Sequence, residues 1–405
     1  MSQLVQLSTS HLTEHSDRWD ALWHRSECRL PSCLAAGLEL WRETFASNNE
    51  LTALVAADGR SFQAALPLVR SRKGGLRSFQ LPADCTVVAG DLLVDPRDEG
   101  EAIEQIADGL CSLPDGLLIF EGIEIEAARW QKLIGCLQER GLTLHQSRGH
   151  DVGVVDILHD WDAYRSSWSK NHRSAIKRTQ NKLNAQGEVS VQRLQAASDA
   201  ELESALEACF AMEDRSWKGQ NGTSILQTPG LRDYYHAEAK LMRDRGLLDL
   251  WILRVDNEPI AFEYCHFAKG VCLSHKISFD PAWDRFSPGR LLRALQLQQY
   301  HDDPACKELD TLGILCEAKA KWITRRYRSA RLFAANGFAP GMAIRGWKSL
   351  RAVRDMRRKT EPTSIKCGAA RYLESANPSQ SSGSFPSLAA PTPQLSPSAL
   401  AHLDR

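Results

Sequence analysis

The sequence predicts an α/β (α+β) protein in which mixed β-sheets are flanked by helices, arranged as two domains. The chain has 405 residues, which is longer than one ordinary domain and fits two. Its 43% hydrophobic and 25% charged residues are the proportions of soluble globular proteins, so most of the chain can form a core. Helical and strand patterns alternate along both halves, which indicates sheets covered by helices.

Composition sets the expected domain boundaries. We expect an N-terminal α/β domain over residues 1–148, a C-terminal domain over 149–358 and a tail over 359–405. The tail is rich in Ser, Pro and Ala and has no apolar periodicity. Such a segment buries too little surface to offset the entropy of ordering, so the sequence predicts a disordered tail.

In the first domain, short β-branched runs alternate with amphipathic stretches. The Asp58-Gly59 pair between two apolar runs is a hairpin signal. Strands are expected near residue 5 and at 51–57, 62–69, 78–81, 117–121 and 142–145, and helices at 17–28, 31–46, 99–111 and 126–140.

The second domain contains three consecutive apolar runs joined by DNEP and AKG, which are short enough for hairpins and predict an antiparallel meander. Asp160 and Asp162 occupy the favoured start of a long helix. Strands are expected at 152–157, 188–194, 248–255, 260–267, 271–279, 308–314 and 342–347. Helices are expected at 161–185, 199–217, 230–245, 291–300 and 319–335, followed by a basic final helix.

Charge and hydropathy exclude several classes of protein. Fifty basic and fifty acidic residues cancel, which argues against stable DNA binding as the main role. No signal-peptide pattern and no run of about 18 apolar residues occurs, so we expect a cytoplasmic protein with no membrane span. Bases nevertheless concentrate in three runs of the second half, at 165–182, 319–331 and 345–359.

The eleven cysteines are odd in number and include no C-x-x-C pair, which favours reduced thiols over a disulfide framework. Cys28 and Cys33 are the closest pair. No second pair matches them, so the sequence predicts no metal site.

Five short segments of the second half occur in an order typical of one enzyme superfamily. They are WSKNHR at 168–173, EDRSWKG at 213–219, EPIA at 258–261, the connection from DP at 280–281 to SPG at 287–289, and KAKW at 319–322. With the meander and the helix after it, they make residues 150–350 resemble the GNAT acetyltransferase fold, in the branch of BioF-like, CelD-like and FemAB-like proteins. Members of this branch often carry two GNAT-like folds in tandem, so the resemblance implies two tandem GNAT-like domains.

The turn before helix 291–300 is the expected seat of acetyl-CoA or another acyl-CoA. A helix N-terminus presents unpaired N–H groups and a partial positive charge, which together bind phosphate. An ordinary helix start is the alternative interpretation. The family's usual loop, Gln/Arg-x-x-Gly-x-Gly/Ala, is replaced by a single glycine, which leaves the acyl carrier open. The predicted cofactor-binding residues are Ser287, Gly289, Arg290 and Leu291, of which the last three would supply amides.

Acyl transfer to an amine requires removal of a proton and a proton donor for the leaving thiolate. Glu263, in the middle of the meander, is the preferred general base; the alternative is a strand glutamate that faces solvent or pairs with a neighbouring lysine. His275 lies on the apolar face of its strand and is either a core histidine or a group that titrates near neutrality. The predicted catalytic residues are Glu263, His275, Asp310 and Tyr300, the last as a candidate acid.

Acceptor binding is expected from side chains near these groups, with solvated helix charges as the alternative. The predicted substrate-binding residues are Trp217, Lys218, Lys319 and Trp322. The bases between 170 and 182 either form a solvated helix face or bind an anionic partner, such as an acyl carrier protein, a transfer RNA or an anionic glycan.

These observations predict an acyltransferase that moves an acetyl or acyl group to an amine or hydroxyl acceptor. The CelD-like resemblance implies an acceptor in cell-surface polysaccharide or envelope synthesis. Two other interpretations stay open: a FemAB-like enzyme that uses aminoacyl-tRNA and a peptidoglycan precursor, and a GNAT-like scaffold without catalysis that binds an acidic partner.

Overall fold

A computed structural model describes residues 3–342 except 60, 74–75, 84–86, 99, 115 and 338–340. The predicted tail, the basic final helix and the predicted strand 342–347 beyond Met342 lie outside the described residues.

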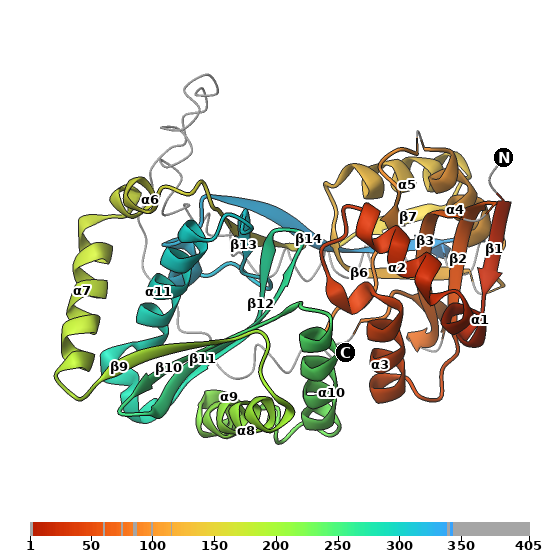
Figure 1. The fold of residues 1–405 in the computed structure, drawn as a ribbon. Helices are drawn as coiled ribbons and strands as arrows, with labels where there is room; N and C mark the ends of the chain where they lie inside the picture. The colour runs from red at the N-terminus through yellow and green to blue at the C-terminus, as the bar shows by residue number, and fades with distance from the viewer. Residues whose placement is uncertain are drawn as a thin grey trace.

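The described strands form one mixed sheet with helices on both faces (Figure 1). The strands are β1 (Gln3–Leu7), β2 (Leu51–Asp58), β3 (Ser61–Lys73), β4 (Leu76–Gln80), β5 (Leu93–Val94), β6 (Leu117–Glu124), β7 (Thr143–Gln146), β8 (His150–Asp156), β9 (Val189–Leu194), β10 (Leu248–Val255), β11 (Glu258–Ala268), β12 (Val271–Phe279), β13 (Glu308–Asp310) and β14 (Arg325–Ala335). Their order is β1-β2-β3-β4-β6-β14-β8-β13-β12-β11-β10-β9, with β5 on β3 and β7 on β14. The predicted α/β class with a mixed, helix-covered sheet is confirmed.

Twelve α-helices and two 3₁₀ turns occur among the described residues. They are α1 (Thr9–Glu14), α2 (Ser16–Arg25), η1 (Pro31–Cys33), α3 (Ala35–Phe45), α4 (Glu101–Cys111), α5 (Ala128–Glu139), α6 (Trp161–Ser167), α7 (Lys170–Asn184), α8 (Asp199–Arg215), α9 (Trp217–Gln220), α10 (Leu231–Asp244), α11 (Pro288–Asp302), α12 (Glu317–Ala320) and η2 (Pro281–Phe286).

Strand alternation places a core on each face of the sheet. In β2, Ala53 and Val55 pack with α2 and α3, whereas Leu54 packs with α4 and α5 on the opposite face. In β11, Tyr264 packs against α10, and Cys265 faces α11. This period-2 pattern is what a sheet covered on both faces requires.

The predicted meander is confirmed as β10, β11 and β12, paired antiparallel. Next to it, β12 and β13 run parallel but pair only as far as Leu273 and Asp310. Beyond that point β12 continues to Phe279 with β11 as its partner, so the sheet opens between β12 and β13.

The pairing of β11 with β12 shifts register opposite Tyr264 and Cys265, and His275 is the extra residue of this β-bulge. A bulge leaves one residue out of the ladder and re-aims its side chain, a device common near active sites.

The predicted helix 319–335 is wrong. The structure has the short helix α12 and then β14, which pairs with β8 through Arg325 to Ser329 and with β6 through Ser329 to Ala335. Arg, Ala and Leu favour helix locally. Buried Ala330, Leu332 and Ala334 nevertheless alternate along β14 and face the N-terminal core, so sheet pairing overrides that preference.

The predicted helix 161–185 is also corrected, since it is two helices, α6 and α7. Trp168 is extended, and the Ser169 hydroxyl accepts a hydrogen bond from the His172 amide, which starts α7 as a new helix. The predicted helix 199–217 similarly ends at Arg215, with α9 following.

Candidate functional site

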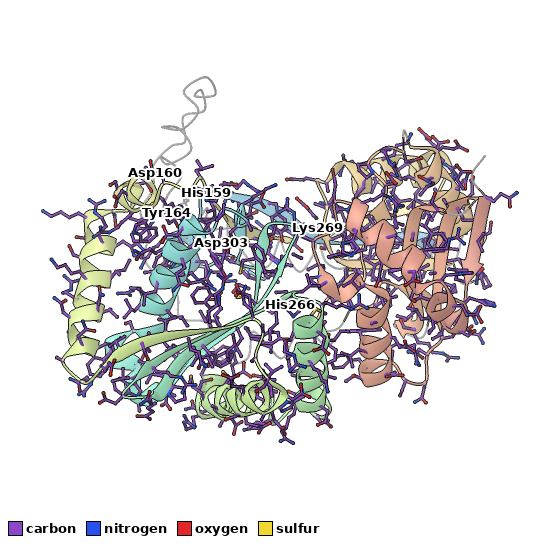
Figure 2. The ribbon with its side chains drawn as sticks, in the orientation of Figure 1. His159, Asp160, Tyr164, His266, Lys269 and Asp303 are labelled. Atoms are coloured by element: carbon purple, nitrogen blue, oxygen red, sulfur yellow. The ribbon has the colours of Figure 1, made fainter. Side chains whose placement is uncertain are left out.

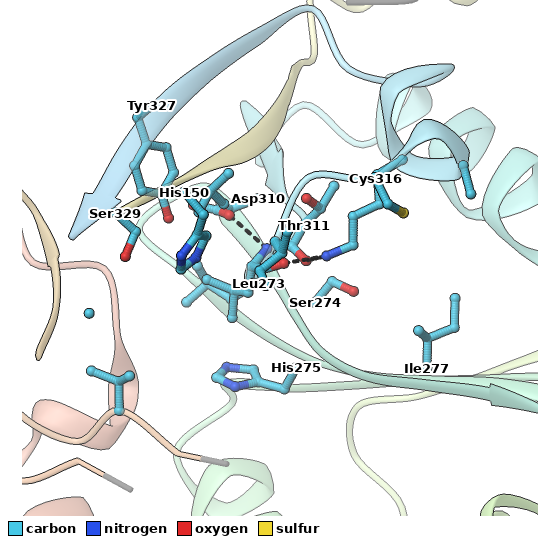
Figure 3. Close-up of a pocket in the computed structure, with 18 of the residues that line it drawn as sticks. His150, Leu273, Ser274, His275, Ile277, Asp310, Thr311, Cys316, Tyr327 and Ser329 are labelled. Carbon is cyan, nitrogen blue, oxygen red and sulfur yellow. Dashed lines mark hydrogen bonds between the residues drawn. The ribbon is translucent and has the colours of Figure 1, made fainter. Parts of the chain in front are cut away.

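A cavity of about 1930 Å³ opens where β12 and β13 diverge (Figure 3). Its wall comes from both halves of the chain: β12, the start of α11, the segment from β13 to α12, and β14 on one side, and β6 with the segment before β5 on the other. The divergence of the two strands creates this space, because none of the described strands pairs with β12 on this side beyond Leu273.

The start of α11 lies on the cavity wall, with Ser287, Gly289 and Arg290 among the lining residues. Leu291 is buried and does not line the cavity. The Arg290 amide donates to the Ser287 carbonyl at 3.0 Å, so it is not free as the sequence interpretation expected. Pro288 has no N–H, which leaves the Gly289 amide as the first-turn donor facing the cavity.

Space for a ligand exists beside Gly289. A Cβ added there would meet no atom nearer than the Phe279 ring at 4.0 Å. The backbone can therefore be approached closely by a ligand, and a larger side chain would project into the cavity without a clash.

Positive charge gathers at this end of the cavity. Burial, together with the charges of Arg290 and Lys321, lowers the pKa of His172 to about 4. Lys319 also lines the cavity; its Nζ donates to the Thr311 carbonyl at 3.0 Å and to the Leu312 carbonyl. An anionic group is the ligand that such an end attracts.

Asp310 lies at the last paired position of β13, on the cavity wall. Its carboxylate accepts the Leu312 amide at 2.9 Å and a hydrogen bond from the Tyr327 hydroxyl. Burial raises the pKa of Asp310 to about 6. Figure 3 shows Asp310 and Tyr327 with His275 around the same space.

His275 reaches the wall from the bulge in β12. Burial, with the charge of Lys276, lowers its pKa to about 4, so the imidazole is neutral at pH 7. Asp310 and His275 are the two predicted catalytic residues that the structure brings to the cavity.

Glu263 and Tyr300 lie behind the wall. Glu263 is fully buried, and its carboxylate accepts a hydrogen bond from Arg293 Nη2 at 2.6 Å. Inside the core, the Tyr300 hydroxyl donates a hydrogen bond to Asp249 at 2.6 Å and accepts one from Trp251 Nε1 at 3.1 Å.

The predicted acceptor residues Trp217, Lys218 and Trp322 also line the cavity. Trp217 is 57% exposed, which is unusual for an indole. Lys218 Nζ donates to Glu213 at 2.5 Å and to the Ile277 carbonyl of β12 at 3.1 Å. Trp322 packs edge-on against His172, with ring centroids 4.4 Å apart.

Sequence reasoning missed Arg293 and Tyr327. Arg293 lines the cavity and also donates to the Ser274 hydroxyl at 3.3 Å. Its signal was a polar stripe on an apolar helix, since Arg293, Gln296 and Tyr300 recur at spacings of three and four and are all buried. Tyr327 could not be found while its segment was interpreted as helix.

No group of three or more His, Cys, Asp or Glu side chains placed to hold a metal ion occurs among the described residues. The described helices also include none with the length and apolar character needed to cross a membrane.

Residues 170–321 match the family model of the acetyltransferase (GNAT) domain. A search of curated proteins found no match.

Solved structures resemble the chain over most of its length. The crystal structure of FemX superposes with a TM-score of 0.56 at 11% identity, covering 82% of this chain and 96% of FemX. A conserved protein of unknown function from Bacteroides thetaiotaomicron gives a TM-score of 0.51 at 12% identity, covering 83% of this chain and 100% of that protein. A C-terminal DUF2156 domain from Agrobacterium fabrum gives 0.51 at 12% identity, covering 84% and 96%. At these identities the likeness concerns the fold.

Proposed function

We propose that the cavity transfers an acyl group, acetyl in the first place, from an acyl-CoA to an amine or hydroxyl acceptor, because residues 170–321 match the family model of the acetyltransferase (GNAT) domain. The observation that carries the proposal is the open Gly289 backbone at the start of α11, beside the gap between β12 and β13. A carrier pyrophosphate placed there meets the Gly289 amide and the helix dipole.

Positive side chains support this placement of the donor. Arg290, Lys319 and Lys321 surround the start of α11 on the cavity wall. Arg290 would add a charge-assisted hydrogen bond to a phosphate. The exposed edge of β12 beyond Leu273 offers backbone groups along which the thioester arm could lie, because β13 no longer pairs with it.

Asp310 is the proposed general base. Its pKa of about 6 leaves it ionised at neutral pH yet basic enough to accept a proton, and the Tyr327 hydrogen bond orients it. The acceptor nitrogen or oxygen bonds to the acyl carbon, its proton passes to Asp310, and the carbon–sulfur bond breaks with the electron pair on sulfur. Glu263 instead holds Arg293, which lines the cavity.

The finer parts of the proposal rest on the family resemblance for the acceptor and the tandem folds, and on composition and hydropathy for the location and the domain bounds. We propose a cell-surface polysaccharide or envelope precursor as the acceptor, and a cytoplasmic location. We also propose the division into domains 1–148 and 149–358 with tandem GNAT-like folds.

The donor seat is tested by isothermal titration of acetyl-CoA, with longer acyl-CoAs in parallel. Gly289→Glu places a negative carboxylate where the phosphate would sit, so we expect its affinity to fall about tenfold or more, which is at least 1.4 kcal/mol. Gly135→Glu is the matched control, because a Cβ at Gly135, in α5, also meets nothing within 4 Å and Gly135 does not line the cavity. Equal affinity in both variants would remove the proposed donor seat.

A second candidate is aminoacyl transfer from aminoacyl-tRNA, as the FemAB-like resemblance implies. The exposed bases on the outer face of α7 favour it, since α7 contains no acidic residue and begins beside the donor end of the cavity at His172. These bases are Lys170, Lys177, Arg178 and Lys182. Binding of tRNA together with no binding of any acyl-CoA would select this candidate, and binding without turnover would select a scaffold.

A further inference from the structure

A row of buried polar side chains leads from the cavity wall into the interior of the C-terminal half. It begins at His275, whose ring centroid lies 4.2 Å from that of His266 on β11. His266 Nε2 is 3.4 Å from the Tyr264 hydroxyl, which is 3.1 Å from Glu238 Oε2 on α10. Figure 2 shows His266 where the meander meets α10. Neighbouring polar side chains therefore lead from the cavity to a buried carboxyl, through a ring contact at His275 and His266 and polar contacts beyond it.

Two nitrogens in the row lack a partner. His275 Nε2 and His266 Nδ1 are both buried, and neither has a hydrogen-bond partner among the described residues. Leaving such an atom unsatisfied costs about 1–3 kcal/mol, so each requires an explanation. The two atoms belong to neighbouring rings whose centroids lie 4.2 Å apart, and a hydrogen bond from one ring to the other would satisfy both. In that arrangement each imidazole would have one nitrogen toward the cavity side and one toward Glu238.

The carboxyl at the inner end is suited to hold a proton. Glu238 is 3% exposed, and burial raises its pKa to about 7, although hydroxyls of Tyr234 and Tyr264 donate to it. Burial lowers the pKa of both imidazoles, so both are neutral at pH 7. The 3.7 Å separation of His266 Nε2 and Glu238 Oε2 is thus not an ion pair at that pH.

The charged groups near the row do not take over the role of Glu238 as the group that holds the proton. Lys276 lies on the same side of β12, with its Nζ 5.4 Å from the Tyr235 ring centroid, and its charge disfavours further positive charge on His275. On α8, the buried Glu213 is already paired with Lys218. The nearby titratable groups therefore leave Glu238 as the proton store of the row.

We propose that Glu238, Tyr264 and His266 form a proton-transfer row that acts through His275 and returns a proton to the thiolate that leaves in acyl transfer. This inference rests on the proposed function, in which Asp310 takes the proton of the acceptor. His275 alone in the row touches the reacting atoms; the other three act through it.

The transfer balances at every step. The sulfur accepts the proton of His275 Nδ1, and His275 Nε2 accepts the proton of His266 Nδ1. When Glu238 is protonated, its O–H donates to the Tyr264 oxygen and the Tyr264 hydroxyl turns from Glu238 to His266 Nε2. From this arrangement His266 Nε2 accepts the Tyr264 hydroxyl proton, and Tyr264 accepts the proton of Glu238. Both rings end in the opposite neutral tautomer and Glu238 ends as a carboxylate, which the Tyr234 and Tyr264 hydroxyls stabilise.

Tyr264→Phe tests the row, because it removes one hydroxyl and no packing volume. The wild-type kcat should fall as pH rises through about 7, as Glu238 loses its proton. In Tyr264→Phe we expect kcat at pH 6.5 to drop on the order of 10- to 100-fold, the fall near pH 7 to vanish, and the KM for donor to change less than twofold. Tyr235→Phe is the control, since its ring packs against Tyr264 at 5.5 Å but lies outside the row. A Tyr264→Phe profile that matches the wild type would overturn the proposal.

A second measurement does not depend on turnover. In ¹⁵N-labelled protein, the imidazole shifts of His266 and His275 should step near pH 7 without the rings becoming cationic, and Glu238→Gln should abolish the step. If the protein turns over no acyl-CoA but the imidazole shifts still step near pH 7, the proposed function fails. The row would then exist without protonating a leaving thiolate. Shifts that do not respond to Glu238→Gln would disprove the row itself.

Discussion

At the residue scale, the cavity combines two kinds of buried charge. Glu263 and Arg293 compensate each other at 2.6 Å, so removing either partner would leave an unpaired buried charge at a cost of about 3–5 kcal/mol. Among the described residues Asp310 has no cationic partner at such a distance, and burial raises its pKa. The first arrangement is structural, whereas the second suits proton exchange.

Asp310→Asn should therefore remove proton abstraction while keeping size and polarity. We expect turnover to fall on the order of 100-fold or more. The carboxylate is the active form, so the wild-type rate should rise with pH through about 6, and the variant should lack this rise. Asp284→Asn is the control, because Asp284 lines the cavity but is exposed. This role would be excluded if Asp310→Asn and the wild type had the same pH–rate profile from pH 4.5 to 7.

At the scale of elements, β14 and its neighbours shape the cavity. Gly149, just before β8, has φ +66°, and a Cβ there would lie 2.3 Å from the Ser329 carbonyl of β14. Only glycine allows β8 and β14 to approach this closely. Tyr327, two residues before Ser329 on the same strand, donates a hydrogen bond to Asp310.

Gly149→Ala is expected to destabilise the protein by more than the left-handed backbone alone explains. Gly141→Ala isolates that backbone cost, since Gly141 has φ +79° and open space around its Cβ position. We expect about 1–2 kcal/mol for Gly141→Ala and a clearly larger loss for Gly149→Ala. Equilibrium urea unfolding measures both, and equal losses would mean that the contact with β14 relaxes freely.

At the scale of the whole molecule, the two halves share one sheet and several polar contacts. β14 pairs with β6 of the first half and β8 of the second. Lys269 Nζ, on the hairpin between β11 and β12, donates to the carbonyls of Trp23, Ser26 and Cys28. The cavity lies between the halves, so its shape depends on these connections.

Unfolding should accordingly be one cooperative transition. Trp19 and Trp23 are buried in the first half and Trp251 in the second. In variants that retain tryptophan at only one of these two sets of positions, the urea unfolding midpoint from fluorescence should equal the midpoint from far-UV circular dichroism. Two separated midpoints would show that the shared sheet does not couple the halves.

Several elements followed from the sequence because their signals are local. The meander of β10 to β12 has hairpin-length turns and β-branched runs, and the start of α11 has its Ser-Pro-Gly turn, so neither needs distant contacts to be recognised. His275 was named from the sequence because it lies in this meander, and Asp310 because it lies in the next predicted strand. The family resemblance was likewise carried by short segments in order, and the match of residues 170–321 agrees with it.

The sequence by itself determined the fold class and the meander, and it predicted a phosphate seat at the start of α11. Only the tertiary structure decided that 325–335 is a strand, that Tyr327 reaches Asp310, and that Glu263 is paired with Arg293 behind the wall. The physical reason is that strand pairing and burial depend on residues far apart in the chain, whereas turns, caps and hairpins depend on neighbours.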